Sequence, residues 1–171
     1  MIRKIFYILL CWVFLSSTLF YAHAQSLKFR HLNADQGLSH NTITCFLQDS
    51  QGYIWIGTQD GLNRYNAYTF EIYKHDTKNS YSLANNYINV LAEDQNKTVW
   101  VGTAGGGLHH YDPRYNRFVR NQEVEQKMVH ALWQDSEGVF WVAAGNILYY
   151  FDKKTQKFTP YPKFTDWELM C

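Results

Sequence analysis

A short pattern, an aspartate followed six residues later by a tryptophan, occurs three times along this chain. The tryptophans are 45 and then 41 residues apart. Self-similarity at this period indicates a row of equal structural units, because a single unit of this size cannot bury its own apolar face. The three pairs are Asp49 and Trp55, Asp94 and Trp100, and Asp135 and Trp141.

Each unit predicts β-strands and shows no helical period. The first strand alternates apolar and polar residues and starts near Ile43, Ile88 or Val129. In the turn that follows, the aspartate side chain caps the backbone and a glycine accepts a positive φ angle. Lys97 stands at that glycine position in the second unit, so we expect its turn to be less ideal.

The rest of each unit completes a four-stranded sheet. The run around each tryptophan is aromatic and β-branched, as strands prefer. A glycine-bearing connection leads to a third strand, and an outer strand holds Phe70, Phe118 or Phe158. The prediction is an all-β fold, a β-propeller with four-stranded blades near residues 38–73, 83–120 and 124–161.

The repeated residues are expected to be structural. Three tryptophans at one repeat position suit the packing of blade on blade better than a ligand cage. The positions expected to hold the repeat together are Asp49, Trp55, Gly57, Asp94, Trp100, Gly102, Asp135 and Trp141.

Three blades make an incomplete propeller. Closure normally needs four to eight blades, and no fourth Asp-x5-Trp follows Phe158. The segment 29–32 is similar to an outer strand that would complete the last blade of a ring. We therefore expect residues 25–171 to be a partial propeller from the front of a longer protein. Its open faces would meet the missing blades or another copy of the chain.

The first 24 residues predict a signal peptide. Arg3 and Lys4 precede an apolar run over 5–20, and Ala22 and Ala24 offer a cleavage site before Gln25. The alternative is an uncleaved membrane anchor, but the run is shorter than the roughly 20 residues that a spanning helix needs. The mature chain is expected in the periplasm or outside the cell.

The first blade carries a recognisable motif. Its Trp55-Ile56-Gly57-Thr58 and Gly61-Leu62-Asn63-Arg64-Tyr65 segments, preceded by Gly37-Leu38-Ser39, resemble the two-component regulator propeller repeats of Bacteroidetes-type bacteria. The third unit departs from that pattern, with Ala143-Ala144 in place of Gly-Thr.

That resemblance implies a role in sensing. Such repeats form the periplasmic sensor of hybrid two-component systems, which carry two propellers, a β-sandwich, a membrane helix, a histidine kinase, a receiver and a DNA-binding module. The resemblance further implies oligosaccharide detection, control of glycan-utilisation genes and homodimerisation of the full-length sensor. The alternative is a secreted lectin-like or scaffold propeller without a signalling role.

Catalytic and metal chemistry find little support in the residues. Gly105–Gly107 lies between two strands and lacks the Lys-Ser/Thr of a phosphate loop. His109 and His110 are adjacent on a strand and point to opposite faces, and Cys45 aligns with apolar residues of the other repeats. With a net charge of +1, the chain has no basic field for nucleic acid. We expect no enzyme activity, cofactor or metal site.

Ligand binding is expected at one end of the central channel. The loops there carry amide and carboxylate groups beside an aromatic ring, a combination that suits sugar hydroxyls and the apolar face of a sugar ring. The alternative is that these side chains only cap turns. The long loop over 74–86 is a further candidate as a group. The candidate ligand residues are Asn41, Gln59, Asp60, Asn85, Asn86 and Tyr87.

Overall fold

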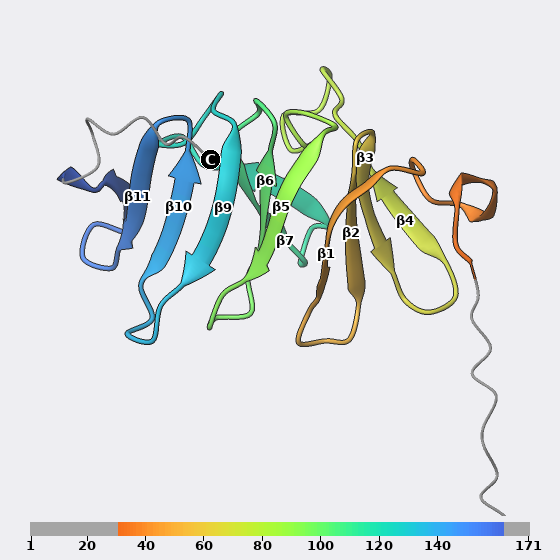
Figure 1. Cartoon of the computed structure of the whole chain (residues 1–171), viewed down its shortest axis with the longest axis horizontal. Coiled ribbons are helices and arrows are strands. Elements are labelled where there is room, and N and C mark those ends of the chain that lie inside the picture. Colours follow the sequence, from red (N-terminus) through yellow and green to blue (C-terminus); the bar gives the residue numbers. More distant parts are fainter. Residues whose placement is uncertain (1–30, 163–171) are drawn as a thin grey trace, which may run out of the picture. The chain divides into compact units, whose positions relative to one another are not determined.

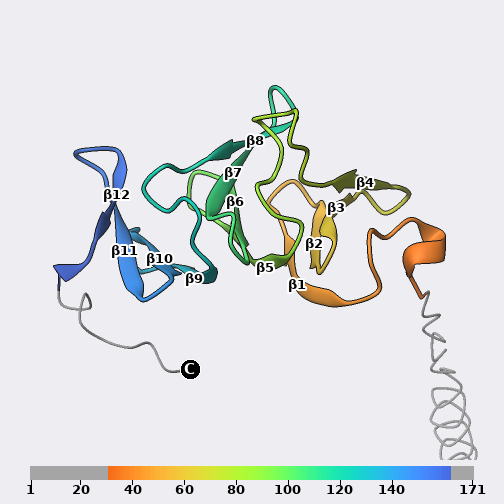
Figure 2. The ribbon, with the colours of Figure 1, turned by 90° about the horizontal axis from the view of Figure 1, so that it is seen from above.

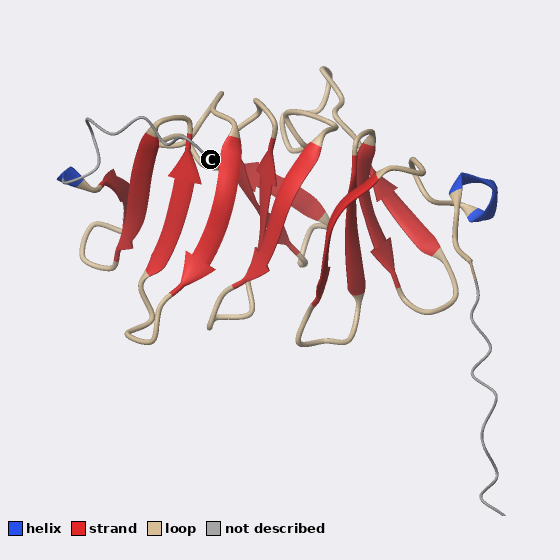
Figure 3. Cartoon of the chain, viewed as in Figure 1, coloured by secondary structure: helices blue, strands red, loops and turns tan. Residues whose placement is uncertain are grey.

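The computed structural model describes residues 31–162. The predicted signal peptide lies outside these residues, as do Cys11 and Cys171. The fold is that of the compact unit that begins at Leu32. Its described secondary structure consists of β-strands and a short 3-10 helix at Ala34–Gln36 (Figure 3). Within 31–162, no helix is long and apolar enough to span a membrane.

The strands form three antiparallel sheets of four, each connected in simple up-and-down order. The all-β propeller prediction is thereby confirmed. The first sheet comprises β1 (Ile43–Gln48), β2 (Ile54–Thr58), β3 (Gly61–Tyr65) and β4 (Phe70–Tyr73). The second comprises β5 (Ile88–Glu93), β6 (Val99–Thr103), β7 (Leu108–Asp112) and β8 (Arg117–Arg120). The third comprises β9 (Val129–Gln134), β10 (Phe140–Ala144), β11 (Ile147–Asp152) and β12 (Lys157–Pro160).

The inner strands of successive blades lie side by side: β1 is next to β5, and β5 is next to β9 (Figures 1 and 2). Side chains at one repeat position link them. Thr44 Oγ1 donates to the carbonyl of Ile88 at 2.5 Å, and Asn89 Nδ2 donates to the carbonyl of Val129 at 3.1 Å. The third member of this series, His130, is exposed on β9.

The Asp-x5-Trp pattern forms one repeated hydrogen-bond unit. In the first blade, Asp49 Oδ1 accepts from the backbone N–H groups of Gln51 and Tyr53, at 3.0 and 2.9 Å. The other oxygen, Oδ2, accepts from Trp55 Nε1 at 2.8 Å. In each blade, the aspartate carboxylate therefore fixes both the turn between the first and second strands and the orientation of the indole. The same bonds recur at Asp94 and Asp135, with indole distances of 2.9 and 2.8 Å.

The oriented indoles pack against the next blade. Trp55 is fully buried, and its ring meets Tyr111 of the second blade edge-on at a centroid distance of 4.9 Å. Trp100 packs edge-on against Phe158 of the third blade at 5.5 Å and lies tilted against Phe140 at 5.4 Å. Burial of each ring stabilises the blade pair, because an aromatic side chain removes roughly 150–250 Å² from water.

In the first two blades, the glycine two residues after the repeated tryptophan allows the blades to approach closely. A Cβ atom at Gly102 would lie 2.6 Å from Val129 Cγ1 of the next inner strand. At Gly57 it would lie 2.8 Å from Ile88 Cγ2. Ala143 occupies this position in the third blade, where its methyl group lines an open hollow instead of a neighbouring strand. The glycines are therefore required by blade stacking.

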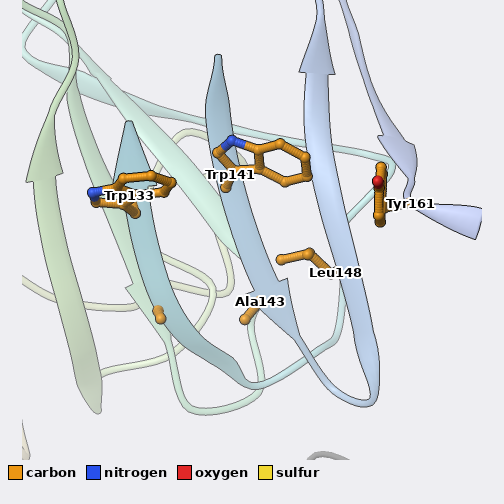
Figure 4. A pocket seen from close by; sticks show the side chains of 6 residues that line it. Trp133, Trp141, Ala143, Leu148 and Tyr161 are labelled. Carbon is orange, nitrogen blue, oxygen red and sulfur yellow. The ribbon is translucent and has the colours of Figure 1, made fainter. Parts of the chain in front are cut away.

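The outward face of the third blade is uncovered by any described residue. Trp141, Ala143, Leu148 and Tyr161 border an apolar hollow of about 370 Å³ there, together with Ala131 and Trp133 (Figure 4). The Trp133 side chain is 62% exposed. Trp141 and Ala143 are the repeat counterparts of Trp55 and Gly57, which meet the next blade.

The aspartate–indole hydrogen bond should contribute more to the free energy of unfolding in a blade whose indole is buried. Asp49→Asn places an amide against Trp55 Nε1 and should lower the free energy of unfolding by about 2 kcal/mol. Asp135→Asn should cost less, because Trp141 lies on the uncovered face. Urea unfolding followed by tryptophan fluorescence measures both variants. Equal losses would contradict this dependence on blade stacking.

The turn of the second blade should improve with glycine. Lys97 has a φ of 64°, in the left-handed region, where Gly52 and Gly138 stand in the other blades. Lys97→Gly should raise the free energy of unfolding by about 0.5–1 kcal/mol, since it relieves a strain that exceeds the entropy cost of glycine. The converse change, Gly52→Lys, should lower the urea midpoint. A loss of stability in Lys97→Gly would contradict the assignment of strain.

Candidate functional site

The loops that enter the inner strands and those that follow the second strands lie at one end of the blades. The strand register produces this arrangement, because the first residue of each inner strand pairs with the last residue of the second strand. The pairs are Ile43 with Thr58, Ile88 with Thr103, and Val129 with Ala144. This end is the upper edge in Figure 1.

The entering loops are held by one apolar anchor and one polar contact. Leu38 and Leu83, five residues before each inner strand, are 4% and 0% exposed. In the first blade, the backbone N–H of Ser39 donates to Asn63 Oδ1 at 2.8 Å. In the second blade, the N–H of Ala84 donates to His109 Nε2 at 3.1 Å.

His109 therefore has a structural role that its sequence context did not indicate. Burial lowers its pKa to about 4, and the nearby charge of Arg120 acts in the same direction. The imidazole is neutral near pH 7, so that Nε2 can accept the bond from Ala84. Alignment of the repeats could have indicated this role. His109 aligns with Asn63, which accepts the equivalent hydrogen bond from the backbone N–H of Ser39.

Backbone hydrogen bonds join the neighbouring loops at this end. The N–H of Gln59 donates to the carbonyl of Thr42 at 3.2 Å, and that of Gly61 donates to the carbonyl of Asn86 at 2.8 Å. The N–H of Ala104 donates to the carbonyl of Tyr87 at 3.0 Å. The six predicted ligand residues are thus gathered at one end of the first two blades.

Asp60 and Asn86 spend their polar atoms on the protein itself, and Asn41 spends its amide oxygen. Asn41 Oδ1 accepts from the N–H of Ala34 at 2.8 Å. Asp60 accepts from Lys74 Nζ at 2.6 Å and from Asn86 Nδ2 at 2.9 Å. The hydrogen bond from Lys74 holds the pKa of the Asp60 carboxyl below its ordinary value. These groups fasten the long loop to the first blade, in line with the turn-capping alternative.

The other three keep groups that can meet a ligand. The Gln59 side chain is exposed, and no described residue bonds its amide. Asn85 Oδ1 accepts from the N–H of Tyr87 at 2.8 Å, which leaves its amide nitrogen available. The Tyr87 side chain is 38% exposed. Two amide groups and one exposed aromatic ring therefore lie at this end of the first two blades.

The long loop also covers a hollow of about 260 Å³ at the outer strands of the first two blades. Ser82 fixes this loop, because its hydroxyl bonds the carbonyls of Asp76 and Asn79 at 3.0 and 2.8 Å. At its border, the guanidinium of Arg117 lies 4.2 Å from the ring centre of Tyr81. This hollow is a second, smaller surface that the loop contributes.

Comparison with known proteins gives a consistent picture. The family model described as "Two component regulator propeller" matches residues 37–60 and 82–105. Histidine kinase P4 of Formosa agariphila is 34% identical over 63 residues, which is 37% of this chain and 5% of that protein.

Solved structures are similar over most of the chain. The extracellular domain described as hybrid two-component system BT3049 from B. thetaiotaomicron matches 80% of this chain with a TM-score of 0.69 and 28% identity. That of BT4673 from the same organism matches 80% with a TM-score of 0.65 and 28% identity. The chain spans about a fifth of each of these domains, 20% and 18%. Residues 37–60 and 82–105 thus match the two-component regulator propeller repeat, and the described blades have the fold of the extracellular sensor domains of hybrid two-component systems.

Proposed function

We propose that this chain is part of an exported, extracytoplasmic sensor that recognises an oligosaccharide and thereby regulates genes of glycan use. The observation that carries the proposal is the set of Gln59, Asn85 and Tyr87 at one end of the blades. In this set, no described residue bonds the amide of Gln59 or the amide nitrogen of Asn85, and the ring of Tyr87 is exposed.

The chemistry of the set suits a sugar. An amide group can donate to one hydroxyl and accept from another, and an aromatic ring offers an apolar plate to the C–H face of a sugar. The surrounding residues are fixed by Asp60, Lys74 and Asn86, so the loop is preorganised and loses little entropy on binding. Support for a signalling role comes from the extracellular domains of the B. thetaiotaomicron systems.

The uncovered face of the third blade fits the same proposal. Its Trp141 and Ala143 are counterparts of residues that meet the next blade at the two internal interfaces. We propose that another blade of the same type covers it. Because Ala143 carries a methyl group where Gly57 and Gly102 have none, such a blade would present a smaller residue on its inner strand than Ile88 or Val129.

Binding at the loop end should depend on the exposed ring. Tyr87→Ala should weaken oligosaccharide binding by about tenfold, since loss of roughly 1.4 kcal/mol of ring contact corresponds to that factor. The measurement is calorimetric titration with neutral oligosaccharides released from starch, xylan and mannan. Tyr68→Ala is the matched control, because Tyr68 is 87% exposed on the β3–β4 turn at the opposite end.

We expect the affinity for the oligosaccharide to fall about tenfold in Tyr87→Ala and to stay unchanged in Tyr68→Ala. Equal effects in the two variants would remove the loop end from recognition. An absence of binding by the wild-type chain to all three sources would count against a neutral oligosaccharide as the ligand.

A further inference from the structure

The crevices between successive blades differ sharply in volume at one repeat position. Eight residues line a space of only about 20 Å³ between the first and second blades. Each of the eight has its repeat counterpart in the wall of a cavity of about 600 Å³ between the second and third blades. Equivalent crevices are therefore closed between the first and second blades and open between the second and third blades.

Large side chains close the first crevice. The guanidinium of Arg64 lies 3.7 Å from the ring centre of Tyr53, and its Nη1 donates to the Tyr111 hydroxyl at 2.9 Å. The hydroxyl groups of Tyr73 and Tyr111 both donate to Asn116 Oδ1 at 2.8 Å. This network fills the space in front of the Trp55 ring.

The second crevice is open because smaller residues replace three of these. Thr98 stands where Tyr53 is, His110 where Arg64 is, and Asn121 where Tyr73 is. All three line the 600 Å³ cavity. A volume of this size lies within the roughly 300–1,000 Å³ of small-molecule sites.

The wall of this cavity is cationic on one side. Arg120 and Lys153 line it, and the structure places no carboxylate in an ion pair with either among residues 31–162. Arg120 Nε is buried and has no hydrogen-bond partner. The one carboxylate in the wall, Asp94, is already occupied by two backbone N–H groups and the indole of Trp100. A buried guanidinium nitrogen without a partner favours an anion with oxygen acceptors.

The remainder of the wall suits a hydroxylated ring. Trp100 and Phe151, both half-buried, present aromatic surface in this wall. Asn121 uses its Oδ1 to accept from the N–H of Val124 at 3.1 Å, which leaves its amide nitrogen for a ligand. The Thr98 hydroxyl adds a group that can donate and accept.

We infer that the crevice between the second and third blades binds a ring-bearing organic carboxylate of the size of a uronic acid. The carboxylate lies against Arg120 and Lys153, the hydroxyl groups meet Thr98 and Asn121, and the apolar face of the ring lies over the aromatic wall. This site is separate from the loop end that carries Gln59, Asn85 and Tyr87.

The test is titration of the full chain with glucuronate and galacturonate, with glucose as the uncharged counterpart, followed by calorimetry and by tryptophan fluorescence. Saturable binding of at least one uronate, and weaker binding of glucose, is expected. Arg120→Ala should weaken it by roughly tenfold or more, because a charge-assisted hydrogen bond is lost. Arg114→Ala, at an exposed arginine outside the cavity, is the matched control and should leave binding unchanged.

A second variant introduces into the crevice between the second and third blades one of the large side chains that close the first crevice. Thr98→Tyr copies Tyr53 and should abolish uronate binding while the urea midpoint stays at or above that of the wild type. Tyr87→Ala should leave uronate binding unchanged, which separates this site from the loop end. The inference is overturned if neither uronate binds, if glucose binds equally well, or if binding survives both Arg120→Ala and Thr98→Tyr.

Discussion

The hydrogen bond between the aspartate carboxylate and the indole N–H couples two levels of this fold. One oxygen of Asp49 closes the turn between the first two strands, and the other sets the plane of Trp55. The indole can then pack flat within its own blade and edge-on against the next, as it does with Tyr111. A turn in one blade thus determines how the following blade docks, and the geometry propagates along the chain with each repeat.

This coupling explains why the fold could be predicted from the sequence and where that prediction ended. The aspartate and the tryptophan occur in all three blades, and Gly57 and Gly102 stand at the points of closest approach in the two blades that have a described successor. Ala143 breaks the pattern, and its methyl group borders the uncovered face. The positive φ of Lys97 agrees with its alignment to Gly52 and Gly138, which is information that the repeat contains.

The candidate site was less accessible from sequence. The loop end could be located, because strand order places those loops together. Which polar atoms stay available could not be deduced, since the side chains of Asp60 and Asn86 are hydrogen-bonded to each other and to Lys74 and His75 of the long loop. The crevice between the second and third blades depends on side-chain size at Thr98 and its neighbours. That difference in side-chain size becomes visible only when equivalent positions of the two crevices are compared, and the structure is needed to show which residues share a crevice.

Hydrogen exchange of the indole N–H groups, followed by NMR with each signal assigned through a tryptophan-to-phenylalanine variant, tests the central claim most directly. The account predicts that Trp55 Nε1–H exchanges most slowly, that Trp141 on the uncovered face exchanges faster, and that Trp133, 62% exposed, exchanges fastest of the three. Exchange of Trp55 as rapid as that of Trp133 would contradict the claim that the aspartate–indole bond is buried by blade stacking.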